Sequence, residues 1–130
     1  MKEEQRELIL RTEEQLLGSL LIAGTDGTTE AIDAVKRIVR PEDFLPNYLM
    51  GQHRRIYEGM LAAIKTDQIS VAGAMWDAGT LQKGDITYMS RLVSLAITSM
   101  DCEVYARQLA DLAKEWQTNR THRARFKGGI

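Results

Sequence analysis

The sequence predicts an all-α protein: a compact bundle of about four helices followed by a C-terminal antiparallel helical hairpin. Apolar residues recur at steps of three and four along most of the chain, as in Ile86, Met89 and Val93, which is typical of one buried helix face. No segment alternates apolar and polar residues for long enough to indicate a β-strand. The last two expected helices each carry two apolar faces, and this favours a hairpin.

Length and composition predict one domain that buries its own core. The chain has 130 residues, of which 44% are hydrophobic and 27% charged. No apolar run approaches the ~18 residues of a membrane span, and Met1–Gln5 lacks the apolar region of a signal peptide, so we expect a cytoplasmic protein without membrane contact. One cysteine, Cys102, and two histidines exclude an internal disulfide and argue against a zinc site. We expect no metal and no cofactor.

The charges are distributed unevenly. Residues 1–116 carry 13 basic and 18 acidic side chains, whereas residues 117–130 carry four basic side chains and no acidic one. The acidic body is therefore a poor general phosphate-binding surface. We interpret residues 117–130 as a solvated basic tail or the start of a linker; weak contact of this tail with nucleic acid is the less favoured alternative.

The first expected helix follows residues 1–11, which we interpret as an N-terminal extension. Thr12–Gln15 has the spacing of a capping box, and Leu16–Leu21 supplies a continuous apolar stripe. Gly18 costs a helix interior roughly 0.5–1 kcal/mol relative to alanine, so another backbone is expected to approach closely there. Gly24 lies where a left-handed C-cap would end the helix.

Caps, glycines and prolines divide the rest of the chain. Pro41 disfavours helical geometry in the residue before it, so the second helix must stop near Arg40, and Pro41–Phe44 forms one short turn. The other expected helices start at Thr28 or Thr29, span Tyr48 to about Lys65, start at the cap Ser70 and end at Gly79, start at the cap Asp85, and span Asp101 to at least Trp116.

The hairpin prediction depends on small residues in the last helix. Cys102, Ala106, Ala110 and Ala113 form a small-residue stripe that lets another helix axis come close. The large residues that remain need a partner, which is either the main bundle or a second copy of the chain. The candidate self-association residues are Tyr88, Leu92, Leu95, Tyr105, Leu109, Leu112 and Trp116.

No constellation in the sequence predicts catalysis. The chain lacks a glycine-rich phosphate loop, and His53 lies on an apolar helical stripe, which favours a structural histidine over a general base. Arg54 and Arg55 follow it directly; solvated arginines are the default, and contact with an acidic partner is the alternative. Trp76 and Trp116 are expected to be core or interface anchors.

Five short motifs in order resemble the N-terminal domain of the bacterial replicative DNA helicase DnaB over about residues 12–116. These motifs are Glu14–Leu21, Pro41–Phe44, His53–Tyr57, Gly84 followed by Tyr88, Met89 and Leu92, and Tyr105–Arg107. Ser70, Gly73 and the Ser99–Cys102 turn depart from the family pattern and suggest a divergent member.

The resemblance implies a helical head followed by a hairpin, with hairpins pairing into dimers and three dimers forming one tier of a hexameric ring. It also implies a docking platform for primase, with the ATPase motor in a separate domain, and contact with nucleic acid mainly through that motor. The alternative family is the C-terminal helicase-binding domain of primase. A third hypothesis is a small enzyme that uses His53 with a nearby carboxylate.

Overall fold

In the computed structural model, residues 2–24, 30–46, 51–63, 71–96 and 102–128 are described, and all regular secondary structure within them is helical. The elements are α1 (Glu3–Ala23), α2 (Glu30–Lys36), the 3-10 helix η1 (Pro41–Asp43), α3 (Gln52–Ala63), α4 (Val71–Asp77), α5 (Asp85–Leu95) and α6 (Cys102–Gly128). The predicted all-α class is confirmed. The expected cap Ser70 and residues 99–101 of the Ser99–Cys102 turn lie outside the described residues.

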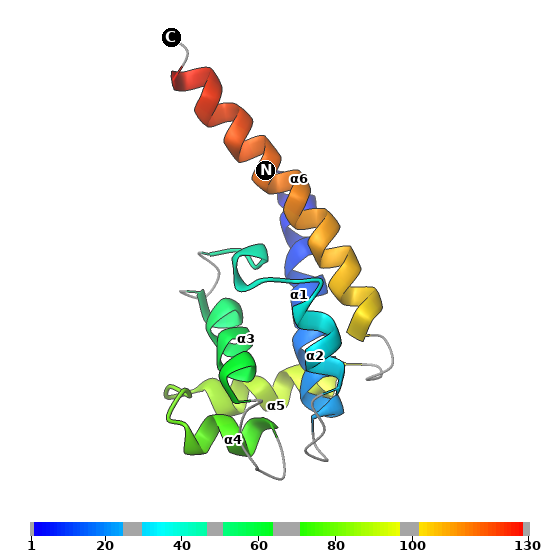
Figure 1. Cartoon of the computed structure of the whole chain (residues 1–130), viewed down its shortest axis with the longest axis vertical. Coiled ribbons are helices and arrows are strands. Elements are labelled where there is room, and N and C mark those ends of the chain that lie inside the picture. The colour runs from blue at the N-terminus through cyan, green and yellow to red at the C-terminus, as the bar shows by residue number, and fades with distance from the viewer. Residues whose placement is uncertain (1, 25–29, 47–50, 64–70, 97–101, 129–130) are drawn as a thin grey trace.

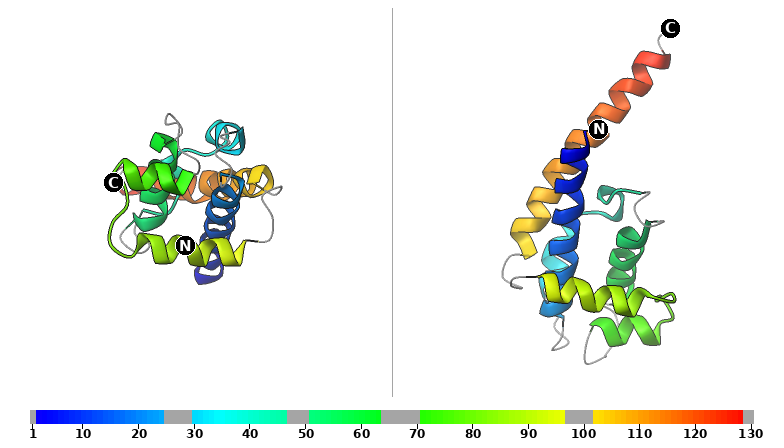
Figure 2. Two further views of the ribbon diagram at one scale, coloured as in Figure 1. Left: turned by 90° about the horizontal axis from the view of Figure 1, so that it is seen from below. Right: turned by 180° about the vertical axis from the view of Figure 1, so that it is seen from behind.

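Helix α1 is the centre of the fold. It contacts α5 and α6 more extensively than any other pair of elements contact each other. Helix α6 runs antiparallel beside it and projects beyond its N-terminal end, while α5 crosses its other end (Figures 1 and 2). Helices α3 and α4 pack together, and α3 also contacts α1. The core therefore lies between α1 and α3.

The first helix begins well before the predicted capping box. Thr12 lies inside α1, where its hydroxyl donates to the carbonyl of Leu8 at 2.8 Å instead of capping a helix start. Ile9 is fully buried in the core, so the predicted N-terminal extension belongs to α1. Helix α1 ends at Ala23, and its C-cap Gly24 has a φ of −88°, so the predicted left-handed cap is wrong.

Within the described residues, the last two helices have different packing partners from those that the hairpin prediction expected. Among the described residues, α5 and α6 do not pack along each other; both pack on α1 instead. The small residues Cys102, Ala106 and Ala113 are buried where α6 meets α1, α2 and η1. Gly18 lets the backbone of α5 approach α1 closely. Helix α1 therefore takes the position that α5 and α6 were each expected to take beside the other.

The other boundaries follow local chemistry. Pro41 starts η1, and the Asp43 carboxylate accepts from the backbone N–H of Arg40 at 2.9 Å, as expected for a short capped turn. Helix α5 starts after Gly84, whose φ of 89° is in the left-handed region. Asp85, the predicted cap, is the first helical residue, and its carboxylate accepts from the backbone N–H of Gln82 at 2.7 Å. Helix α6 continues to Gly128, so the basic segment is helical through that residue.

Candidate functional site

Glu13 and His53 form a fully buried pair. His53 Nδ1 lies 2.7 Å from Glu13 Oε1, and neither side chain is exposed. The other ring nitrogen, Nε2, hydrogen-bonds to the hydroxyl of Tyr88, and Glu13 Oε2 accepts from the backbone N–H of Leu45 at 2.8 Å. One polar cluster therefore joins α1, α3, α5 and the segment that follows η1.

The electrostatics of this cluster follow from its burial. Desolvation raises the pKa of Glu13 above 4.5, although hydrogen bonds from His53 and Leu45 oppose the rise. A perturbed carboxyl beside a histidine is a candidate catalytic pair, but a substrate cannot reach two side chains without exposed surface. The burial of His53 fits the structural role predicted for it and argues against the small-enzyme hypothesis.

A second polar cluster joins α3 to the start of α5. Arg55 donates to Asp85 Oδ1 at 2.8 Å, and Gln52 donates to the same oxygen at 3.0 Å. Burial acts to raise the pKa of Asp85, but its bonds from Gln82, Gln52 and Arg55 outweigh this and hold the pKa below its usual value. Arg55 thus neutralises a buried carboxylate and is not the freely solvated arginine expected by default.

Arg54 also has internal partners. Its guanidinium donates to the carbonyl oxygens of Phe44 at 2.7 Å and Glu42 at 3.3 Å. Gln117 on α6 donates to the Glu42 carbonyl as well, at 3.1 Å. Arg54 therefore fixes η1 beside α3, and any partner contact through Arg54 or Arg55 would have to share these guanidinium groups.

The seven candidate self-association residues do not form one exposed ridge. Leu92, Leu109 and Trp116 are buried in the chain's own core, because α1 and its neighbours cover these faces of α5 and α6. Tyr88 is half-buried against His53, and Tyr105 and Leu112 are half-buried beside the core. Leu95 is the exposed member of the set. The burial of Leu92, Leu109 and Trp116 argues against these three as contact residues, and self-association of the domain stays a prediction.

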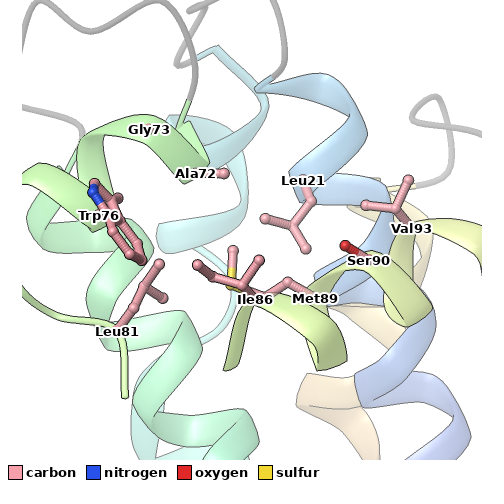
Figure 3. Close-up of a pocket in the computed structure, with 9 residues that line it drawn as sticks. All are labelled: Leu21, Ala72, Gly73, Trp76, Leu81, Ile86, Met89, Ser90 and Val93. Atoms are coloured by element: carbon pink, nitrogen blue, oxygen red, sulfur yellow. The ribbon is translucent and has the colours of Figure 1, made fainter. Parts of the chain in front are cut away.

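An apolar groove lies between α4 and α5, with a cavity volume of about 360 Å³. Figure 3 shows Trp76 and Leu81 toward one end, Val93 toward the other, and Leu21 and Ile86 between them. The lining residues are Leu21, Ala72, Gly73, Trp76, Leu81, Ile86, Met89, Ser90 and Val93. Trp76, Ile86 and Val93 are 62%, 48% and 38% exposed, which is unusual for large apolar residues clustered on one surface.

Sequence reasoning missed this groove although its signal was present. Ile86, Met89 and Val93 recur at steps of three and four along α5, which is typical of one apolar helix face. Trp76 was expected to be a core or interface anchor; its exposure favours the interface, whereas Trp116 is in the core. The buried carboxylate was also missed. Glu13 lies four residues after Ile9 and three before Leu16, on the apolar face, which could have indicated it.

The comparisons with known proteins agree with this architecture. A family model described as the DnaB-like helicase N terminal domain matches residues 6–111. The chain belongs to this family. Its fold is similar to the crystal structure of the N-terminal domain of DnaB helicase from Mycobacterium tuberculosis, with a TM-score of 0.74 and 23% sequence identity over 92% of this chain and 84% of that one. A search of curated proteins found no match.

Membership of the DnaB-like family makes this chain part of a replicative helicase and favours that prediction over the primase domain. The matched region is the N-terminal domain, which is not the ATPase motor. Within the described residues, no group of three or more histidine, cysteine or acidic side chains could hold a metal ion. No helix in the same part of the chain is long and apolar enough to cross a membrane.

Proposed function

We propose that this DnaB-like domain is a non-catalytic assembly and primase-interaction module of a replicative helicase, acting in DNA replication. The observation that carries the proposal is that the domain buries several polar groups while it exposes several large apolar side chains. The buried polar groups Glu13, His53 and Asp85 bond to other parts of the same chain, so they stabilise the fold. Six large apolar side chains of the described residues, by contrast, are exposed at the surface.

The exposed apolar residues suit a protein that binds other proteins. They lie on four helices and comprise Leu8, Trp76, Ile86, Val93, Leu95 and Val104. Scattered apolar residues are normal on a soluble surface, but a cluster around a cavity is typical of an interaction site. The groove between α4 and α5 is such a cluster, and Leu8 and Val104 are candidates for contact with a second copy of the domain.

The test uses the domain as it is, alone and with the primase of the same organism. Sedimentation velocity over a range of concentrations should show reversible self-association, and a faster-sedimenting complex should form when primase is added. A domain that stays monomeric and does not bind primase would contradict the proposal.

Contact of nucleic acid with the basic residues 117–130 stays a separate prediction. Such binding would be electrostatic, so its affinity should fall steeply with salt concentration. Titration of labelled single-stranded DNA at two salt concentrations, with the full chain and with a chain truncated after Trp116, measures it. Equal affinity of the two chains would contradict this prediction.

A further inference from the structure

We infer that the buried Glu13–His53 pair is an acid-sensitive latch: one proton held between the two side chains closes it, and a second proton releases the backbone of Leu45 from it. This inference is separate from the proposed interaction function. It follows from the hydrogen-bond donors and acceptors that meet at the pair, from the complete burial of both side chains and from the charges beside them.

Both oxygens of the Glu13 carboxyl already have a neighbour. Oε2 accepts from the backbone N–H of Leu45 at 2.8 Å, and Oε1 lies 2.7 Å from His53 Nδ1. The other ring nitrogen, Nε2, hydrogen-bonds to the hydroxyl of Tyr88, which can donate or accept. One carboxyl and one imidazole thus connect α1, α3, α5 and the segment after η1.

One proton between Oε1 and Nδ1 satisfies this arrangement. Either Glu13 is a carboxylate that accepts from an imidazolium, or it is a carboxylic acid that donates to a neutral imidazole. In both cases Oε2 remains an acceptor for Leu45. The pair has no net charge in either case, which suits two side chains without exposed surface.

A second proton cannot be added without the loss of a hydrogen bond. If Oε1 and Nδ1 both carried hydrogen, two donors would face each other, so the carboxyl must hold its proton on Oε2. That oxygen already accepts from the N–H of Leu45. The bond from an imidazolium is charge-assisted and stronger than the bond from a backbone amide, so the bond from Leu45 is the one that breaks.

The neighbouring charges act in the same direction. Among the described residues, the side chains that act on the charge of Glu13 are His53 and Arg54, both on α3. The hydroxyl of Tyr88 faces the ring of His53 from α5. Arg54 is already positive, so these groups offer no counter-charge for the second proton. The buried positive charge is relieved when the latch opens and water reaches the pair.

The opening is local, because other bonds hold η1 in place. Arg54 donates to the carbonyl of Phe44 at 2.7 Å, and Gln117 on α6 donates to the carbonyl of Glu42 at 3.1 Å. The backbone N–H of Phe44 donates to the carbonyl of Pro41 at 3.2 Å. None of these bonds uses Glu13, so they persist when the Leu45 amide is released.

Amide hydrogen exchange of the full chain, followed by NMR, tests the latch. The protection of each amide relative to an unfolded chain is measured from about pH 7 to about pH 4, where ordinary histidine and glutamate side chains take up protons. We expect the protection of the Leu45 amide to fall by about tenfold or more as the pH falls, and that of the Phe44 amide to stay constant. A Leu45 protection that is constant, or that falls only together with Phe44, would overturn the inference.

The variant His53→Gln separates the second proton from other effects of acid. Its amide can still donate to Glu13 or accept from it, but it does not titrate, so the pair never takes up a second proton. The protection of Leu45 in this variant should therefore be independent of pH, and a fall equal to that of the native chain would contradict the latch.

A measurement on the native chain decides the matter if His53→Gln does not fold. The nitrogen NMR signals of the His53 ring are distinguished from those of His122 by the variant His122→Gln. We expect the His53 signals to shift over the same pH range in which the Leu45 amide loses its protection. Signals that shift over a different range would overturn the inference.

Discussion

Gly18 of α1 lies directly against the backbone of Leu92 on α5. A β-carbon at Gly18 would lie 2.4 Å from the Leu92 carbonyl oxygen and 2.9 Å from the β-carbon of Ala96. The close approach predicted from the helix-breaking glycine is therefore confirmed, and its partner is identified. A glycine at this position lets two helices cross at backbone distance, and this crossing orients the groove-forming face of α5.

Gly18→Ala should destabilise the domain, because the contact at 2.4 Å is with backbone and cannot be relieved by a side-chain rotation. We expect a loss of about 2–3 kcal/mol in the free energy of unfolding, measured by urea denaturation. Gly59→Ala is the control: its new methyl group would meet the flexible end of Met75 at 3.0 Å. A Gly18→Ala variant as stable as this control would contradict the prediction.

Removal of one member of the Glu13–His53 pair should cost more than its hydrogen bond. His53→Leu leaves the Glu13 carboxyl buried without its partner, and we expect a loss of about 3 kcal/mol. The double variant Glu13→Leu with His53→Leu should be more stable than the sum of the single effects predicts, by about 1–3 kcal/mol. Chemical denaturation of the four proteins completes the cycle, and additive effects would show that the two residues do not interact.

The raised pKa of Glu13 gives the stability a defined pH dependence. The folded state keeps a proton that the unfolded chain releases near pH 4.5, so this contribution is fully present below pH 4.5 and is lost as pH rises through the folded-state pKa. The free energy of unfolding should therefore fall over this range in the native chain, and the fall should be smaller in Glu13→Gln. Parallel pH profiles of the two proteins would argue against this assignment.

Asp85 should act in the opposite direction. Its folded-state pKa is lowered, so its contribution is present above the ordinary value of 3.8 and is lost as pH falls through the folded-state pKa. Arg55→Gln removes one donor to this carboxylate and should lower the stability at neutral pH by about 2 kcal/mol, with a weaker acid dependence. Arg91→Gln, at an exposed position on α5, should change the stability little and serves as the control.

Charges placed at Leu92 and Leu109 should unfold the domain. Both side chains are fully buried, so Leu92→Asp or Leu109→Asp buries a carboxylate without a partner and should cost about 4 kcal/mol or more. Circular dichroism should show a loss of cooperative unfolding, not a folded monomer. Leu95 is exposed on α5, the helix that carries Leu92, so the Leu95→Asp variant should remain folded. A Leu92 or Leu109 variant that folds and stays monomeric would contradict this prediction. It would indicate that these residues belong to an interface between copies of the chain.

The sequence alone predicted what depends on local periodicity and steric rules. Spacing of apolar residues predicted the helices, and Pro41 predicted the short turn, because both effects act within a few residues. The sequence could not identify the true start of α1, since the acids and threonine of Thr12–Gln15 satisfy a capping pattern whether or not the helix continues before them. It also did not show that Glu13 pairs with His53, because the two residues lie 40 positions apart in the chain.

By itself, then, the sequence determined the helical class, the membership suggested by five ordered motifs, and the close contact at Gly18. Only the tertiary structure decided which helices meet. A helix with two apolar faces, such as α5, can satisfy either face with any neighbour of suitable shape, because hydrophobic burial is not directional. Here α1 occupies one face of α5, and the other, with Trp76, forms the groove.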